Sequence, residues 1–155
     1  TGKLRMNVRP ATKSDISAIV RLLADDPLGT GRERFDDPLP QAYYDAFDAI
    51  TKQAGNQVLV AVESEDVVGC LQLTFIPGLT RCGMTRAQIE GVRVDKTRRG
   101  RNIGEALFRF AIDLARENGC GSVQLTTDKT RPDAHRFYER LGFVASHEGM
   151  KLALE

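Results

Sequence analysis

The apolar residues of this chain recur with two alternating spacings, one typical of strands and one typical of helices. The runs at 57–63 and 67–76 are short, rich in β-branched residues and separated by turn residues, which favours a strand hairpin. Helical spacing follows Thr12 and recurs over about 41–53 and after Gly104. The pattern predicts a strand, two helices, three strands, a helix, a strand, a helix and two final strands. Such an order belongs to the α/β or α+β class.

The other predicted elements extend this pattern over the whole chain. Strands are expected at 5–9, from Arg86 onward, and at 122–127, 143–145 and 150–154, and the last helix at 133–141. At 155 residues the chain is long enough to bury a core, and no linker divides it. We therefore treat 1–155 as a single domain. The loop at 28–40 is long, and loops of that kind are usually functional or mobile.

Composition and charge exclude several classes of protein. The formal net charge of +1 argues against a nucleic-acid-binding protein. No apolar run reaches membrane-spanning length, and the first residues do not form a signal peptide, so no membrane partner is expected. Cys70, Cys82 and Cys120 are scattered and lack metal-ligand spacing, which predicts reduced thiols in a cytoplasmic protein and no bound metal.

The stretch 89–118 carries the strongest chemical signal. A strand-like run leads through a basic, glycine-containing turn into a long helix that follows Gly104. This geometry directs unpaired backbone N–H groups, at the positive end of a helix dipole, toward one point, which favours a phosphate group. It is not a P-loop, because Glu105 and not a Lys-Ser/Thr pair follows Gly104. A dinucleotide fingerprint also fails, because Asn102 follows Arg101 and no third glycine comes later.

The segment from Arg99 to Gly104 reads R-x-x-G-x-G with Asn102 in place of the middle glycine. It resembles the acyl-CoA-binding motif of the GCN5-related N-acetyltransferase (GNAT) superfamily. Asparagine tolerates a left-handed backbone better than most residues, so the departure is mild. A second segment, from Ala134 to Phe143, has the pattern A-x-x-F-Y-x-x-x-G-F and resembles the last helix of that family. The simpler interpretation of the first segment is a surface helix capped by three arginines and a glycine.

The resemblance implies a fold and an activity. The fold would be the single-domain acyl-CoA N-acyltransferase fold, a mixed, mostly antiparallel sheet of six to seven strands, splayed between strands 4 and 5 and flanked by four helices. The activity would be direct transfer of the acetyl group of acetyl-CoA, the co-substrate, to a primary amine in a ternary complex. Pairing through the later strands would make a homodimer, with Val144, Leu152 and Leu154 at the sheet edge.

The same resemblance assigns roles to individual residues. Tyr138 would protonate the departing thiolate and Glu90 would act as general base, while backbone N–H groups at Val92 or Val94 would polarise the thioester carbonyl. Cofactor contacts would come from Val92, Arg93, Val94, Arg99, Gly100, Arg101, Asn102, Ile103, Gly104, Glu105, Arg131, Phe137 and Tyr138. Arg131 stands where many members have asparagine. The alternatives are that Tyr138 only packs beside Phe137 and that Glu90 is solvated or paired with Arg86 or Arg93.

The acceptor is left open by the sequence. Acidic residues of the first loop, among them Asp25 and Asp26, could attract a cationic amine, but nearby arginines balance them. A small-molecule amine, an aminoglycoside-like compound, a peptide N-terminus and a lysine side chain are all compatible with the chain. Two other classes stay open beside the enzyme: a non-catalytic acyl-CoA sensor of the same fold and, more distantly, a nucleic-acid-binding module.

Overall fold

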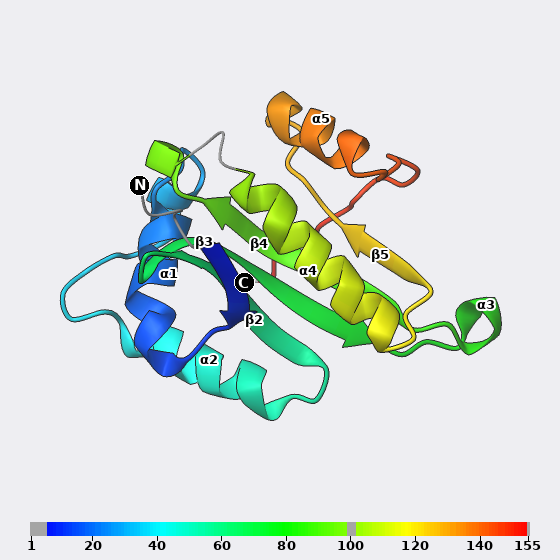
Figure 1. Ribbon diagram of the computed structural model, residues 1–155, viewed down its shortest axis with the longest axis horizontal. Helices are drawn as coiled ribbons and strands as arrows, with labels where there is room; N and C mark the ends of the chain where they lie inside the picture. Colours follow the sequence, from blue (N-terminus) through cyan, green and yellow to red (C-terminus); the bar gives the residue numbers. More distant parts are fainter. Residues whose placement is uncertain (1–5, 99–101, 155) are drawn as a thin grey trace.

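A computed structural model describes residues 6–98 and 102–154, and in it five strands form one mixed sheet in the order β1-β2-β3-β4-β5 (Figure 1). The strands are β1 (Met6–Pro10), β2 (Asn56–Glu63), β3 (Asp66–Ile76), β4 (Arg86–Val94) and β5 (Ser122–Leu125). Neighbours from β1 to β4 pair antiparallel, and β5 runs parallel to β4. The predicted mixed, mostly antiparallel sheet is therefore confirmed.

The four predicted helices are also present. They are α1 (Ile16–Ala24), α2 (Gln41–Lys52), α4 (Ile103–Glu117) and α5 (Pro132–Arg140). A further short turn, α3 (Thr80–Gly83), lies between β3 and β4 and was not predicted. It has only four residues, too few to show a helical spacing of apolar residues, and its Arg81 and Cys82 have left-handed backbone angles. No helix in the described ranges is long and apolar enough to cross a membrane.

Two helices cover opposite faces of the sheet. Side chains of a strand point alternately to either face, so β2 directs Leu59 toward α4 and Val60 toward α1. The larger cluster lies under α4, where Phe108 is fully buried, and the smaller one lies under α1. Figure 1 shows α4 lying along the sheet and α1 beside α2 at the end of the sheet nearer β1. The sheet is thus covered on both faces, and the apolar side chains of β4 pack on the α4 side.

A bulge in β4 sets the direction of the side chains that follow it. The β3–β4 register shifts between Cys70 and Gln72, and Gly91 opposite them has a φ of 62°, which glycine adopts without strain. Ile89 faces the α4 side before the bulge, and Val92 faces that side after it. Pairing between β4 and β5 ends at Ile89, so the second half of β4 has an open edge. This is the opening expected between strands 4 and 5.

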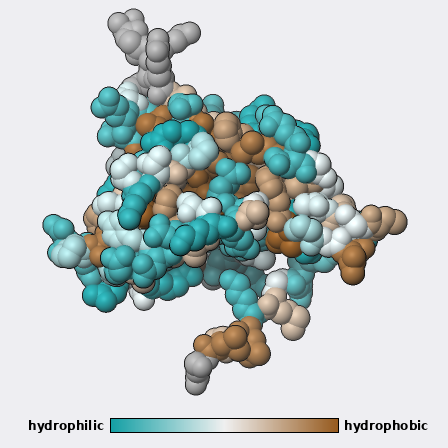
Figure 2. Space-filling view, turned by 90° about the horizontal axis from the view of Figure 1, so that it is seen from below, coloured by the Kyte–Doolittle hydropathy of each residue, from teal (hydrophilic) through white to brown (hydrophobic). Residues whose placement is uncertain are grey.

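The prediction of two final strands was wrong. Residues 143–154, all described, form no strand, so the sheet has five strands and not six to seven. The alternating apolar pattern is real, but Val144, Met150, Leu152 and Leu154 are exposed, with Leu152 at 86%. Figure 2 shows this end of the chain as an apolar projection below the body. A β-strand needs another strand to pair with as well as an alternating apolar pattern. Within the described residues, no strand pairs with this segment.

Candidate active site

The first turn of α4 offers free backbone donors. Asn102 precedes it with φ 58° and ψ 26°, which confirms the left-handed backbone predicted at this position. Its carbonyl already accepts the N–H of Ala106 at 3.0 Å, and no side chain caps the helix. The N–H groups at 103–105 therefore have no partner within the helix, and with the helix dipole they suit an anion. Arg99, Gly100 and Arg101 lie outside the described residues.

Gly104 brings the two sequence motifs into contact. A Cβ atom at this position would lie 3.2 Å from Cζ of Phe137 and 3.6 Å from Cγ2 of Val94. The absence of a side chain therefore lets α5 approach the first turn of α4. Glycine at this position allows a ligand to approach the backbone, and it also allows α5 to pack closely. The sequence motif alone did not show the packing reason.

Tyr138 belongs to a group of aromatic rings between α4 and α5. Its ring lies 5.4 Å from Phe108, 5.5 Å from Phe137 and 6.0 Å from Phe143, measured between centroids. No hydrogen bond joins its hydroxyl to another described residue. Burial raises the pKa of Tyr138, and the positive charges of Arg131 and Arg93 oppose that rise. The phenol therefore keeps its proton at neutral pH and is available as a donor.

A small cavity lies between the second half of β4, the loop after α1 and the start of α5. It is lined by Leu22, Asp25, Asp26, Val92, Arg93, Val94, Lys96 and Arg131. Four of these were predicted as cofactor contacts, namely Val92, Arg93, Val94 and Arg131. The structure thus brings together parts of β4 and α5 that are far apart in the sequence. The two aspartates were considered only as attraction for a cationic acceptor.

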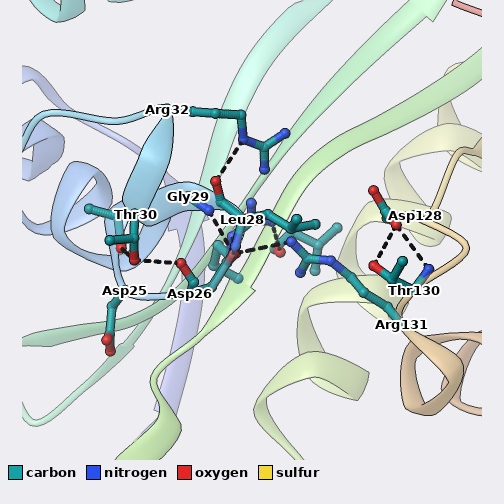
Figure 3. Close-up of polar contacts among 12 residues, drawn as sticks. Asp25, Asp26, Leu28, Gly29, Thr30, Arg32, Asp128, Thr130 and Arg131 are labelled. Carbon is teal, nitrogen blue, oxygen red and sulfur yellow. Dashed lines mark hydrogen bonds and ion pairs between the residues drawn. The ribbon is translucent and has the colours of Figure 1, made fainter.

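Asp26 is the centre of a polar cluster in this cavity (Figure 3). One carboxylate oxygen lies 2.6 Å from Nε of Arg93, and both oxygens accept from Nη2 of Arg131 at 3.2 Å. The N–H groups of Leu28 and Gly29 donate to Oδ1 at 2.8 Å each. Burial alone would raise the pKa of this carboxyl, but these donors and the two arginines hold it at about 2. The carboxylate of Asp26 is therefore already paired and is not free to bind a cationic amine.

Arg93 and Arg131 consequently have a role beside the predicted one. The bulge at Gly91 turns the side chain of Arg93 away from α4 and toward the loop after α1, where it meets Asp26. Arg131 is the residue immediately before α5, and its guanidinium also reaches Asp26. Contacts of either residue with acyl-CoA stay predictions.

Glu90 is exposed on β4, opposite Gln72 of β3. Within the described residues it forms no ion pair with Arg86 or Arg93, so of the two alternatives to a catalytic role only the solvated one applies. A solvated carboxylate at the edge of the open part of β4 is compatible with a general base. Arg98, by contrast, donates to Glu63 at 2.7 Å and to Asp66 at 2.9 Å, so it links β4's exit to the β2–β3 hairpin.

Comparison with known protein families identifies the same class of protein as the fold and the two motifs. The profile of the Acetyltransferase (GNAT) family matches residues 18–143, so the chain belongs to this family. The resemblance carried by the two sequence motifs is therefore confirmed.

Two named relatives and one solved structure are similar to this chain. Glucosamine 6-phosphate N-acetyltransferase of Trypanosoma brucei brucei is 38% identical over 89 residues, which cover 57% of this chain and 58% of that enzyme. Aminoalkylphosphonate N-acetyltransferase of Salmonella typhimurium is 33% identical over 107 residues, 69% of each chain. A crystal structure described as a transcriptional regulator from Bacillus halodurans C-125 is 51% identical, covers 97% of this chain and 100% of its own, and superposes with a TM-score of 0.94.

Proposed function

We propose that this protein transfers the acetyl group of acetyl-CoA directly to a primary amine within a ternary complex. The observation that carries the proposal is the position of Tyr138. Its hydroxyl lacks a partner among the described residues, on a helix that packs against the first turn of α4. Structures of the family contain CoA, and an unpartnered phenol beside such a site serves transfer better than it serves packing.

The chain provides complementary groups for each part of acetyl-CoA. The free N–H groups at 103–105, helped by the arginines of the preceding turn, suit the pyrophosphate. The open edge of β4 at Val92 and Val94 offers backbone groups to the pantetheine arm and to the thioester carbonyl. The two regions adjoin, because a Cβ atom at Gly104 would lie 3.6 Å from Cγ2 of Val94. The contact of Gly104 with Phe137 and Val94 supports one continuous binding path from the first turn of α4 to the second half of β4.

Acetyl transfer then requires three events, for which the chain has candidate groups. A neutral amine attacks the carbonyl carbon, and Glu90, directly or through water, accepts the proton that the amine loses. The oxyanion that forms accepts a hydrogen bond from a β4 N–H group. The carbon–sulfur bond then breaks, and Tyr138 donates its proton to the departing CoA thiolate. No acyl-enzyme is required, which agrees with the burial of Cys70 and its pKa, raised by that burial to about 12.

The two relatives suggest which acceptors to test first. Their names specify glucosamine 6-phosphate and aminoalkylphosphonates, which are small amines. We propose a small-molecule amine as acceptor, in a cytoplasmic setting that suits three free thiols. The test is CoA release from acetyl-CoA with a panel containing both compounds, an aminoglycoside, a lysine peptide and a free peptide N-terminus. Acceptor-dependent CoA release with at least one of them supports the enzyme, and its absence throughout the panel contradicts it.

A second candidate is a non-catalytic acyl-CoA sensor. The Bacillus halodurans structure, which is described as a transcriptional regulator, favours this alternative. A sensor would bind acetyl-CoA in calorimetry and release no CoA with any acceptor. Retention of the Tyr138 hydroxyl favours the enzyme, because a sensor has no use for a proton donor at that position.

We also propose a homodimer formed through the C-terminal segment 150–154. Met150, Leu152 and Leu154 are exposed at every second position, as in a strand that lacks a partner. The outer edge of β5 has no neighbour within the described residues, so the segment of one copy fits the β5 edge of another. Light scattering should give a dimer mass for the full chain and a monomer mass for a chain ending at Glu148. A monomeric full chain at micromolar concentration would contradict the proposal.

A further inference from the structure

We propose that Asp26 is a positioning residue for acetyl transfer, because it ties Arg131, at the start of the helix that carries Tyr138, to Arg93 on the open half of β4. The inference rests on the proposed function, in which Tyr138 donates the proton and β4 receives the thioester. Asp26 itself would touch neither the thioester nor the acceptor. It would act by fixing the relative position of two elements between which the reaction occurs.

The carboxylate of Asp26 and the backbone of Arg131 are each held by local hydrogen bonds. The N–H groups of Leu28 and Gly29 fix the carboxylate of Asp26, each at 2.8 Å. On the other side, the carboxylate of Asp128 accepts from the N–H of Thr130 at 2.9 Å and from its hydroxyl at 2.6 Å (Figure 3). The N–H of Arg131 donates to the carbonyl of Asp128 at 3.1 Å. Only the side chain of Arg131 is therefore left to be ordered when the pair forms, which favours a rigid link.

This link holds the end of α5 that the aromatic rings do not reach. Phe137 and Tyr138 anchor the later part of the helix against Phe108 of α4, at 5.7 Å and 5.4 Å between ring centroids. Arg131 anchors its beginning to Asp26 and, through it, to Arg93 of β4. With only the aromatic anchor, α5 would be free to tilt about Phe108. A tilt would move the Tyr138 hydroxyl relative to β4, and displacements of about 1 Å at a reacting centre are costly.

Asp26 also balances the charge around Tyr138. Among the described residues, the charged groups that face this tyrosine are Arg131, from the start of α5, and Arg93, from β4, while α4 and the segment after α5 present Phe108 and Phe143. The two arginines lower the pKa of the phenol and burial raises it. A neutral residue at 26 would leave both positive charges uncompensated. The pKa of Tyr138 would then fall, and the alkaline limb of the transfer rate would move to lower pH.

Asp15 offers a matched control for the loss of a buried carboxylate. It is as buried as Asp26, it pairs with Arg9 at 2.7 Å and it accepts the N–H of Thr12 at 2.8 Å. Arg9 belongs to β1, at the opposite edge of the sheet from β5. Asp15→Asn should therefore reproduce the loss of stability caused by Asp26→Asn without affecting the reaction.

The experiment compares single-turnover acetyl transfer, over a range of pH, by the parent, Asp26→Asn, Asp15→Asn, Tyr138→Phe and the double variant Asp26→Asn/Tyr138→Phe. For Asp26→Asn we expect a fall of at least about tenfold in the transfer rate, a smaller change in acetyl-CoA affinity and an alkaline limb at lower pH. Asp15→Asn should keep the parent rate and profile. In the Tyr138→Phe background, Asp26→Asn should lower the transfer rate much less, because the hydroxyl that Asp26 positions is absent.

Two results overturn the inference without affecting the proposed function. One is an equal rate and profile for Asp26→Asn and Asp15→Asn, and the other is an equal loss from Asp26→Asn in both backgrounds. If Tyr138→Phe alone transfers at the parent rate, the proposed acid is wrong, and the inference is overturned with it. If Asp26→Asn is too unstable to assay, Asp26→Glu keeps the charge, and a parent-like position of its alkaline limb with a reduced rate supports positioning. A parent-like rate for that variant would overturn it.

Discussion

The first turn of α4 and the Asp26 cluster both concentrate charge near β4, yet they are built in different ways. The turn uses adjacent residues, and its geometry follows from a left-handed Asn102 and the N–H groups of one helix. The cluster joins Asp26 to Arg131, 105 positions later in the sequence. A sequence motif can therefore predict the first region, whereas the second can be recognised only in the folded structure. Under the proposed function, binding of acetyl-CoA is encoded locally and alignment of the reacting groups is not.

Of the effects that separate these two regions, the largest is expected in the first turn of α4. Gly104→Val should weaken acetyl-CoA binding by more than tenfold, because a branched side chain would block the N–H groups of the turn. It should also destabilise the fold by about 1–3 kcal/mol through contact with Phe137. Calorimetry and denaturant unfolding measure the two effects, and Gly104→Ala, which adds one methyl group, should show less of each. A folded Gly104→Val variant with parent affinity would remove the anion site from α4.

The next effect tests the Asp26 cluster through the pH dependence of the free energy of unfolding. The pKa of Asp26 is lowered to about 2 in the folded protein, below its ordinary value. Its contribution to stability is therefore complete above the ordinary value of about 4 and is lost as the pH falls toward about 2. The free energy of unfolding of the parent should exceed that of Asp26→Asn by a margin that narrows by about 2 kcal/mol over this window. Urea unfolding at several pH values measures it, and a constant margin would show that Asp26 is not held as an ion pair.

The smallest effect separates conformation from chemistry within the turn. Asn102→Gly should fold and bind acetyl-CoA about as well as the parent, because glycine adopts a left-handed backbone freely. Asn102→Val should lose about 1–2 kcal/mol of stability, because β-branched side chains resist that conformation. Denaturant unfolding of both variants is the measurement. Equal stability of the two would mean that the backbone at this position is not left-handed in solution.

The sequence predicted the parts of the fold that depend on neighbours along the chain. Apolar spacing located β2, β3, α1 and α4, and a glycine substitute at Asn102 was correctly assigned a left-handed backbone. The two final strands were wrong, because the alternation at 150–154 says nothing about which strand would lie beside it. For Glu90 the sequence left two alternatives to catalysis open, and the described residues show the solvated one and not an ion pair with Arg86 or Arg93.

The bulge at Gly91 shows how a local irregularity changes a distant part of the site. Without it, Arg93 would face the α4 side, as Ile89 does before the bulge, and would not reach Asp26. A glycine within a strand is a recognised signal for a bulge, but its consequence depends on which loop lies above the strand. The dipeptide Asp25-Asp26 at the end of α1 gave no sign of which carboxylate would be buried. Only Asp26 meets the two arginines, while Asp25 pairs with the exposed Lys96.

The central claim is that the Tyr138 hydroxyl protonates the departing CoA thiolate, and Tyr138→Phe tests it by removing one oxygen atom. Loss of a general acid typically costs about a hundredfold or more in rate. Single-turnover transfer, which excludes the effect of slow product release, should fall by that amount, with acetyl-CoA affinity and thermal stability nearly unchanged. Transfer at the parent rate over the whole pH range would contradict the account and would leave Tyr138 as a packing partner of Phe108 and Phe143.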